Sequence, residues 1–346
     1  MTWSKKSSSL LWFIPPVYDM ERLYTCWKES YQAWWVPVIY GPTATGKTAL
    51  SIYIARKLAD QGQIVEIISA DSRQVYRGMD IGTDKVDPII RRQIIHHMID
   101  CIDPDEIFTA GQWQQEVYKL IPEIQSRGHI PMIVWGTGLY IDAVIFDFTM
   151  GLGTPDWEYR NVLEKQHYEA LNNGDTTLLR RMLDKCDPKE AMKHHPSSTR
   201  FIIRALELYH QTGIPKSQLV TKSTPRFPLQ LIGLQQDRDI WNNLIDMRIE
   251  QMLDRGLLSE VEWLLNAGWS PNSNALKTID YRQTIDYLMS HGRMSYDEYV
   301  YTLQVAHHQL AKKQRTWFRR YTHLFMSGNQ LPMMRYTPIH MNDMIL

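Results

Sequence analysis

The hydrophobic positions of the chain fall into short apolar runs that are separated by longer amphipathic segments. The apolar runs predict buried strands at Val36–Tyr40, Ile64–Ser69, His97–Asp100, Ile130–Trp135 and Leu229–Leu234, with a weaker one at His323–Met326. Helical segments such as Gly111–Ser126 lie between them. The first strands are about 30 residues apart, as in βα units. This alternation predicts an α/β fold with a parallel sheet flanked by helices.

Two parts of the chain depart from this rhythm. Residues 151–196 are rich in charged and helix-forming residues and lack a strand-like run, which predicts a small helical insertion domain. After Leu234 the pattern is almost wholly helical, and helices are expected at Asp239–Arg255, Ser259–Asn266, Tyr281–Ser290 and Tyr296–Arg320. We therefore expect a core made of residues 36–150 and 197–330. Residues 1–35 would be an N-terminal extension, helical or partly disordered, and residues 331–346 a C-terminal tail.

Composition narrows the class of protein. Of the 346 residues, 44% are hydrophobic and 22% are charged, which is enough for a packed core. The 38 basic and 38 acidic residues balance, so any nucleic-acid surface must be local. The three cysteines lack C-x-x-C spacing, which argues against a disulfide framework or a zinc site and suits the cytoplasm.

Neither a membrane helix nor a signal peptide is expected. No apolar run reaches the roughly 18 residues that a membrane helix needs. The apolar run Leu10–Ile14 follows two lysines near the N-terminus, but it is short and is interrupted by Pro15 and Pro16. These features do not fit the apolar region of a signal peptide, so we expect no export.

The segment from Gly41 to Thr48 reads G-P-T-A-T-G-K-T and fits the phosphate-binding P-loop. Its glycines let the backbone curl so that N–H groups point at phosphate oxygens. Lys47 supplies a point charge, the Thr48 hydroxyl can ligate Mg²⁺, and the helix expected at Ala49–Leu58 presents its positive end to the same anion. The predicted phosphate-binding residues are Gly41, Pro42, Thr43, Ala44, Thr45, Gly46, Lys47 and Thr48. The motif does not identify the ligand as ATP, and a glycine-rich turn without a ligand is the alternative.

Two strand ends carry candidate chemistry. Asp71 follows the run Ile64–Ser69, at the carboxyl end where open α/β sheets bind ligands. Its carboxylate could hold a metal, accept a proton or only cap a turn. Gly136-Thr137-Gly138 ends the run Ile130–Trp135, where a P-loop ATPase would carry a Walker-B aspartate. These glycines fit either the close approach of a ligand or a tight turn.

The segment Ala311–Arg320 is strongly basic. The residues that share one face at helical spacing are His308, Lys312, Arg315 and Arg319. Such a face could contact backbone phosphates of a nucleic acid, or it could simply be solvated.

Two further patterns are weaker. Arg248 borders the apolar face of its helix and could pair with Asp246 or Glu250, or bind diphosphate. His96 and His97 are adjacent on an expected strand and so point opposite ways, which makes them a poor metal site. We interpret both histidines as structural.

Taken together, these segments resemble the tRNA dimethylallyltransferase (tRNA isopentenyltransferase) family, bacterial type. The resemblance runs from about Val38 to Phe325 and includes Arg248 with its helix. It rests on G-P-T-A-T-G-K-T (41–48), A-D-S-R-Q-V-Y-R-G-M-D-I-G-T-D-K (70–85), H-H-M-I-D-C-I-D-P (96–104), G-T-G-L-Y (136–140), H-P-S-S-T-R-F-I-I-R-A-L-E (195–207), Y-R-Q (281–283) and Q-L-A-K-K-Q-R-T-W-F-R-R (309–320). The second motif is the most specific.

The resemblance implies a P-loop NTPase-like fold and a reaction. The family moves a dimethylallyl group from dimethylallyl diphosphate to the exocyclic amine of the adenine just 3′ of the anticodon. The P-loop would then cradle the diphosphate rather than ATP, with Thr48, Arg248 and Mg²⁺ at the leaving group. Asp71 would be the general base, and Thr137 would lie near the target adenine. The expected partners are tRNA and dimethylallyl diphosphate, with no membrane, for a cytoplasmic monomer.

The resemblance also implies tRNA contacts. They are expected from the helical insertion and from Asp71, Ser72, Arg73, Gln74, Thr137, Arg160, Arg200, Arg204, Arg282, Lys312, Arg315 and Arg319. The positions that depart from the family pattern are Trp135, Leu244, Asp280, His307 and His308. These departures leave Asp71, the P-loop and Arg248 intact and fall mostly on the expected RNA surface.

Other functions stay open. An adenylate isopentenyltransferase would use the same chemistry on a free nucleotide, but it would not need the helical insertion or the basic C-terminal helix. A P-loop kinase of small molecules is disfavoured because a Walker-B aspartate is missing after Ile130–Trp135. A non-enzymatic RNA-binding protein would not need the P-loop and Asp71.

Overall fold

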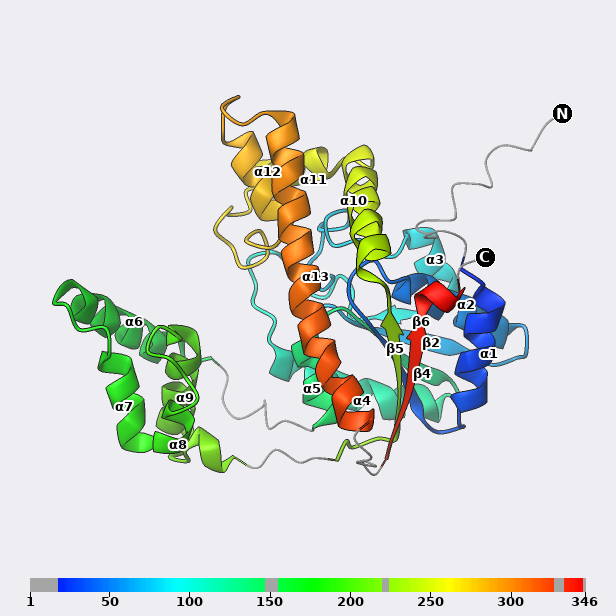
Figure 1. Cartoon of the computed structure of the whole chain (residues 1–346), viewed down its shortest axis with the longest axis horizontal. Coiled ribbons are helices and arrows are strands. Elements are labelled where there is room, and N and C mark those ends of the chain that lie inside the picture. The colour runs from blue at the N-terminus through cyan, green and yellow to red at the C-terminus, as the bar shows by residue number, and fades with distance from the viewer. Residues whose placement is uncertain (1–17, 147–154, 220–223, 327–332, 345–346) are drawn as a thin grey trace. The chain divides into compact units, whose positions relative to one another are not determined.

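A computed structural model of the chain describes residues 18–146, 155–219, 224–326 and 333–344 (Figure 1). Its strands form one parallel sheet in the order β3-β2-β4-β1-β5-β6. The strands are β1 (Val36–Tyr40), β2 (Val65–Ala70), β3 (His96–His97), β4 (Ile130–Trp135), β5 (Leu229–Gln235) and β6 (Met334–His340). The central strand, β1, is wholly buried, as its continuous apolar run predicts. The expected α/β fold with a parallel sheet is confirmed.

The ends of the sheet differ from the sequence-based prediction. Strand β3 has two residues rather than the expected His97–Asp100, because the chain turns at Met98 and Asp100, whose φ values are 63° and 55°. The strand expected at His323–Met326 is wrong, since these residues continue helix α13 (Tyr296–Met326). Strand β6 lies instead in the expected tail. It contains Pro338, which is tolerated because β6 is an edge strand.

One face of the sheet is covered by helices from the first part of the chain. They are α1 (Met20–Ser30), α2 (Lys47–Ala59) and α3 (Pro88–Gln93). Asp19 caps α1 by accepting a hydrogen bond from the N–H of Arg22, and the helix buries Leu23 and Trp27 against the sheet. Part of the N-terminal extension is therefore an ordered helix, while residues 1–17 lie outside the described residues.

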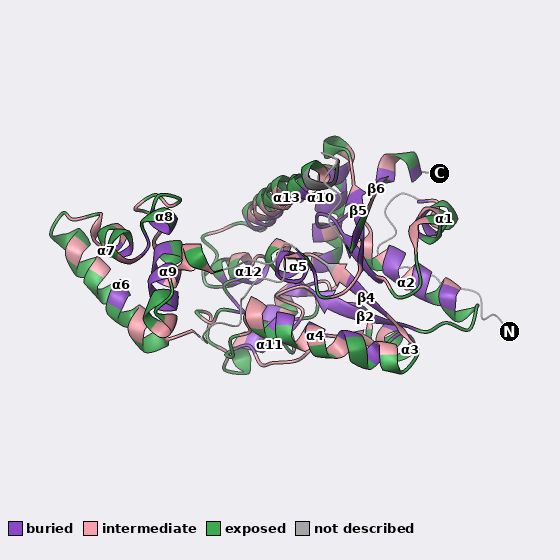
Figure 2. Cartoon of the chain, turned by 90° about the horizontal axis from the view of Figure 1, so that it is seen from below, coloured by how far each residue is buried: buried purple, intermediate pink, exposed green. Residues whose placement is uncertain are grey.

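The other face is covered by α4 (Ala110–Ser126), α5 (Gly138–Ile145) and the C-terminal part of α13. Tyr40 of β1 packs edge-on against Phe318 and Tyr321 of α13, with ring centroids 5.6 and 5.4 Å apart. Trp113 of α4 donates to the carbonyl of Ser69 at 2.9 Å, at the end of β2. Strands β1, β2 and β5 lie almost wholly buried between these layers (Figure 2), whereas the edge strands β3 and β6 are partly exposed.

A second apolar core holds the remaining helices of the sheet domain. It joins α10 (Arg238–Asp254), α11 (Leu257–Asn266), α12 (Tyr281–Leu288) and the N-terminal half of α13. Val75, Tyr76 and Met79, from the segment after β2, are buried in the same core. This packing fixes the segment that carries the longest sequence motif, directly after Asp71.

Among the described residues, 155–219 belong to a separate compact helical unit. Its helices are α6 (Trp157–Asn172), α7 (Leu178–Cys186), α8 (Pro188–Ala191) and α9 (Thr199–Thr212). The sequence placed residues 197 onward in the core, but α9 packs in this unit, because its buried Ile202 and Leu206 meet Leu163 and Leu183. The expected insertion at 151–196 is thus too short at its C-terminal end.

Candidate active site

The P-loop lies between β1 and α2, as the motif predicts. Gly46 has a φ of +80°, a conformation that favours glycine, and α2 begins at the next residue. A Cβ atom on Gly41 would lie 2.8 Å from the carbonyl oxygen of Leu234, so this position has no room for a side chain. The Thr45 hydroxyl donates to the carbonyl of Pro42 at 2.8 Å and closes the loop. The first N–H groups of α2 therefore border a preformed anion site.

Lys47 is the central cation of this loop. In the ligand-free geometry its ammonium donates to the carbonyl of Pro42 at 2.5 Å. Burial lowers the pKa of Lys47 to about 7; the nearby Arg248 charge adds to this shift, and Asp71 and Asp84 oppose it. A buried cation with a lowered pKa gains most from an anionic ligand, which would raise its pKa again.

Arg248 reaches the P-loop from α10. Its guanidinium donates to the Thr43 hydroxyl, and its Nε lies 3.4 Å from a carboxylate oxygen of Asp84. Asp84 also pairs with Arg255 at 2.9 Å. The structure thus places Arg248 beside the P-loop, and no ion pair with Asp246 or Glu250 is found among the described residues. Asp246 pairs instead with His308 at 2.8 Å.

Asp71 lies at the carboxyl end of β2 and uses its two carboxylate oxygens differently. Oδ1 accepts a hydrogen bond from the N–H of Arg73 at 2.8 Å, which is the capping role. Oδ2 lies beside Gly136, where an added Cβ atom would be only 3.0 Å away. No described residue donates a hydrogen bond to Oδ2, and Asp71 lines a cavity. One oxygen thus holds the turn while the other is available to a ligand.

Thr137 sits across from Asp71 on the loop after β4. Its hydroxyl accepts a hydrogen bond from the N–H of Ser72 at 3.3 Å and lies 3.4 Å from the Ser72 hydroxyl. The Gly-Thr-Gly turn is therefore docked onto the segment that follows Asp71. Neither glycine has room for a side chain, because an added Cβ atom would lie 3.0 Å from the Asp71 carboxylate at Gly136 and 2.6 Å from the Trp317 ring at Gly138. The approach of a ligand to this turn stays a prediction.

Gln314 of α13 joins the two loops, and the sequence analysis missed it. Its Oε1 accepts a hydrogen bond from the N–H of Thr43 at 2.8 Å, and its Nε2 donates to the carbonyl of Gly136 at 2.7 Å. One side chain thus bridges the P-loop and the turn beside Asp71. The sequence did contain a signal for Gln314. It is a polar residue at helical spacing from Leu310 and Trp317, on the uncharged face of α13.

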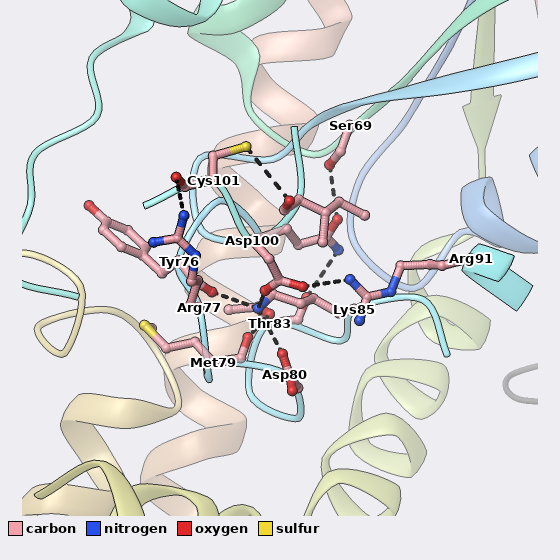
Figure 3. A network of polar contacts seen from close by, with 12 residues as sticks. Ser69, Tyr76, Arg77, Met79, Asp80, Thr83, Lys85, Arg91, Asp100 and Cys101 are labelled. Carbon is pink, nitrogen blue, oxygen red and sulfur yellow. Dashed lines mark hydrogen bonds and ion pairs between the residues drawn. The ribbon is translucent and has the colours of Figure 1, made fainter. Parts of the chain in front are cut away.

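The sixteen-residue motif after β2 is organised by a buried cation. The Lys85 ammonium donates to the carbonyl of Tyr76 at 2.6 Å and to the carboxylates of Asp80 and Asp100 at 2.7 and 2.5 Å (Figure 3). Gln74 also turns inward. It accepts from the Ser69 hydroxyl at 2.9 Å and donates to backbone carbonyls of residues 83 and 84. Both polar atoms of the Gln74 side chain thus make hydrogen bonds within the protein, and its contact with tRNA stays a prediction.

Two cavities meet at the P-loop. The larger has a volume of about 500 Å³, and its lining includes Lys47, Asp71, Thr137, Arg248 and Gln314, as well as Lys277, Asp280 and His307. The smaller encloses about 160 Å³. The residues Lys47, Thr48 and Arg248 border both. The candidate leaving-group site is thus approached from two sides.

Two of the residues that depart from the family pattern, Asp280 and His307, form a buried pair in the lining of the larger cavity. His307 Nε2 lies 2.6 Å from Asp280 Oδ1, and each side chain is only 4% exposed. Asp280 has a φ of +77°, a backbone conformation that favours glycine. The pair with His307 holds an aspartate in that conformation. The other pair from the sequence, His96 and His97, makes structural bonds to the Ile94 carbonyl and to Glu66. Within the described part of the chain no cluster of metal-ligating side chains is found.

The expected tRNA-contacting arginines differ in how free they are. Arg160 and Arg204 both pair with the buried Glu207, and Arg160 does so through two bonds of 2.7 Å. Arg282 pairs with Asp286 at 2.9 Å, and Arg73 donates to the Asn274 carbonyl at 3.2 Å.

The remaining basic candidates are exposed and have no hydrogen-bond or ion-pair partner among the described residues: Arg200, Lys312, Arg315 and Arg319. These side chains are the ones most available to phosphates.

Comparisons with known proteins agree on one family. Residues 74–321 match the family model described as IPP transferase. A tRNA dimethylallyltransferase of Pelotomaculum thermopropionicum is 40% identical over 82% of this chain and 87% of its own length. One of Thermotoga maritima is 37% identical over 83% of this chain and 90% of its own.

Solved structures are similar too. The full-length tRNA isopentenylpyrophosphate transferase of Bacillus halodurans is 36% identical, with a TM-score of 0.59, and the match covers 89% of this chain and 90% of that one. A eukaryotic dimethylallyltransferase acting on tRNA is 26% identical, with a TM-score of 0.73, over 88% of this chain and 73% of that one. The fold is therefore shared with these proteins.

Proposed function

We propose, from the premise that this chain belongs to the IPP transferase family, that it transfers a dimethylallyl group from dimethylallyl diphosphate to tRNA. The acceptor is the exocyclic amine of the adenine just 3′ of the anticodon. The observation that carries the proposal is a single cavity that is lined by the cations Lys47 and Arg248 and by Asp71, whose Oδ2 accepts no hydrogen bond from the described residues. A diphosphate and an amine that loses a proton require these opposite charges.

In the proposed reaction one bond forms and one bond breaks at the same allylic carbon atom. The amine nitrogen of adenine forms a bond to the allylic carbon, and the bond from that carbon to the diphosphate oxygen breaks. The electron pair of the broken bond leaves with the diphosphate, and the amine proton passes to Asp71. Negative charge therefore grows at the P-loop end while a proton is accepted at the Asp71 end.

The P-loop end is built to hold the departing charge. The ammonium of Lys47 and the guanidinium of Arg248 lie at the start of α2, whose N–H groups add a favourable dipole. Groups that are already positioned stabilise the leaving group without reorganising during the reaction. Arg248 is in addition held by Asp84, which keeps it at the site before the substrate binds.

Mg²⁺ is the proposed cofactor at the same end. The Thr48 hydroxyl makes no hydrogen bond with the described residues and borders both cavities, so it is free to act as a ligand. A magnesium ion on a diphosphate needs few protein ligands, because water and phosphate oxygens supply the others. When bound, it would neutralise the charge that the diphosphate carries.

Substrate binding is expected to take up a proton at alkaline pH. Free Lys47 has a pKa of about 7, and a bound diphosphate raises it toward the ordinary value for lysine. Between those two values binding protonates Lys47, so affinity falls as the pH rises above about 7. Calorimetry at pH 8 in buffers of different ionisation enthalpy should show about one more proton taken up by the wild type than by Lys47→Met. Equal uptake by the two proteins would contradict this pKa assignment.

The tRNA partner accounts for the exposed basic groups. The target adenine must leave its stack to place its amine near Asp71, and the anticodon loop must therefore be held elsewhere as well. Lys312, Arg315 and Arg319 of α13 are exposed and lie on the helix that also carries Gln314. We propose that they contact backbone phosphates. We propose a cytoplasmic protein, in keeping with its three free cysteines, and a monomer stays a prediction. Within the described residues no helix is long and apolar enough to cross a membrane.

Replacing Lys312, Arg315 and Arg319 together by alanine should weaken tRNA binding and reduce its dependence on salt. Each lost phosphate contact is expected to lower the slope of log affinity against log salt concentration by roughly one. Affinity is measured by fluorescence anisotropy across a salt series. The matched control replaces Lys28 and Lys57, which lie on α1 and α2 of the sheet domain. A triple variant with the slope of the wild type would show that this face of α13 is only solvated.

The acceptor assay tests the proposal directly. The protein is incubated with labelled dimethylallyl diphosphate and Mg²⁺, together with either tRNA or AMP. We expect label on tRNA alone. Label on AMP alone would identify an adenylate isopentenyltransferase, and phosphoryl transfer from ATP without prenyl transfer would identify a kinase. Either of these results would overturn the proposal.

A further inference from the structure

The helical unit exposes an aromatic pair that its own core does not use. Phe201 of α9 is 58% exposed, and its ring is stacked on that of His194 with the centroids 5.5 Å and the planes 8° apart. The neighbours Ile202 and Ile203 point the other way, into the core of the unit. Phe201 therefore presents one ring face to solvent although burying it would be favourable.

The partner ring is held in place. His194 Nε2 lies 3.1 Å from the buried carboxylate of Glu190, and the His194 carbonyl accepts a hydrogen bond from Arg180 at 2.5 Å. Glu190 is itself held in place, since its carboxylate accepts a hydrogen bond from Lys193 at 2.8 Å and its N–H donates to the Asp187 carboxylate at 3.1 Å. The His194 ring thus supports Phe201 from behind, and the pair is ordered before any partner binds.

The segment that carries the pair has more basic than acidic residues, and although Lys193 and Arg204 pair with Glu190 and Glu207, Lys189 and Arg200 have no acidic partner among the described residues. Residues 189–204 contain four basic side chains (Lys189, Lys193, Arg200 and Arg204) and one acidic side chain (Glu190), whereas the whole chain has no net charge. Arg200 precedes Phe201 directly, is exposed, and has no partner among the described residues. By contrast, α6 in the same unit carries three acidic and two basic residues. The exposed ring thus lies in the basic part of the unit.

We propose that the Phe201–His194 pair is a stacking platform for an unpaired base of the tRNA anticodon loop, with Arg200 on the adjacent phosphate. This inference rests on the proposed function, which supplies tRNA as the substrate. An exposed aromatic face with flanking cations is how proteins bind single-stranded nucleic acid. Flipping the target adenine also removes a stacking neighbour from an adjacent base, and an aromatic ring can replace it. Only a loop base offers a free face, since bases in a duplex are already stacked.

The test compares three variants in binding an anticodon stem-loop RNA. Phe201→Leu keeps an apolar side chain but removes the aromatic face, and Phe201→Trp keeps that face. Tyr168→Leu removes a ring that is 66% exposed on α6, outside the basic segment, and serves as the control. Base stacking on an aromatic side chain typically changes affinity by roughly 5-fold to 100-fold. We expect that loss for Phe201→Leu, near-normal affinity for Phe201→Trp, and no change for Tyr168→Leu.

A spectroscopic signal identifies stacking itself. The fluorescent base 2-aminopurine, placed at one loop position at a time, should be quenched by the wild type at one position and be brighter there with Phe201→Leu. Wild-type affinity and quenching in Phe201→Leu would overturn the proposal. The proposal would also be overturned if Phe201→Leu bound RNA as the wild type does but eluted at a different volume in gel filtration. This surface would then be one that packs against another protein molecule. Dimethylallyl transfer at saturating tRNA is measured in parallel: its absence in the wild type would overturn the proposed function, while the binding data would still decide this inference.

Discussion

Asp71→Asn is expected to fold and to bind both substrates normally while its turnover collapses by roughly 10²- to 10⁴-fold. The amine of adenine is a poor nucleophile, because its lone pair is delocalised into the ring. A carboxylate within hydrogen-bond reach can orient this amine and take its proton as the new bond forms. Asparagine still offers an oxygen to the N–H of Arg73, so the turn is kept and only the basicity at Oδ2 is lost. The effect is measured by single-turnover kinetics, with dimethylallyl diphosphate limiting and both the protein and the tRNA in excess over it.

The control is the same substitution at a plain helix cap. Asp19 accepts a hydrogen bond from the N–H of Arg22 at 3.0 Å and starts α1. Asp19→Asn should leave turnover unchanged. If Asp71→Asn instead lowered the melting temperature and kept its rate per folded molecule, Asp71 would be a cap and not the base.

Lys47→Ala should lose most of its transferase activity, by on the order of 3 kcal/mol in transition-state stabilisation, or about 100-fold in rate. The reason is the loss of a positioned charge at the place where the diphosphate departs. Stability should not fall with activity, because the pKa of about 7 shows that the ligand-free fold disfavours this ammonium. Steady-state kinetics and thermal unfolding measure the two effects separately.

Lys57 offers a control on the same helix. It lies on α2, pairs with Glu21 on the surface and lines neither cavity. Lys57→Ala should stay within twofold of the wild-type rate. A rate within twofold of wild type for Lys47→Ala itself would remove the P-loop from the catalytic account.

The parts of the site that could be predicted are those whose signal is local. The P-loop is contiguous, and Asp71 and Thr137 each follow an apolar strand closely, so their place at the sheet edge follows from the strand pattern. Arg248 was ambiguous because its role depends on where α10 docks. Packing of that helix brings it to Thr43, more than two hundred residues away in the sequence.

The parts that could not be predicted depend on contacts between distant segments. Gln314 joins the N–H of Thr43 to the carbonyl of Gly136. Both partners lie in motifs that the sequence shows, but their contact with Gln314 depends on where helix α13 packs. Strand β6 was missed because Pro338 argues against a strand, and only its place at the sheet edge permits it. The Asp280–His307 pair links two separate departures from the family pattern that the sequence could only note individually.

The most direct test of the central claim is to locate the product within the tRNA. Wild-type protein, Asp71→Asn and Lys47→Ala are incubated with unmodified tRNA, Mg²⁺ and dimethylallyl diphosphate, and the RNA is digested and sequenced by mass spectrometry. The account predicts one dimethylallyl group, on the exocyclic amine of the adenosine 3′ to the anticodon, formed by the wild type and almost absent with both variants. A product at another position, or one that the two variants form as fast as the wild type, would contradict it.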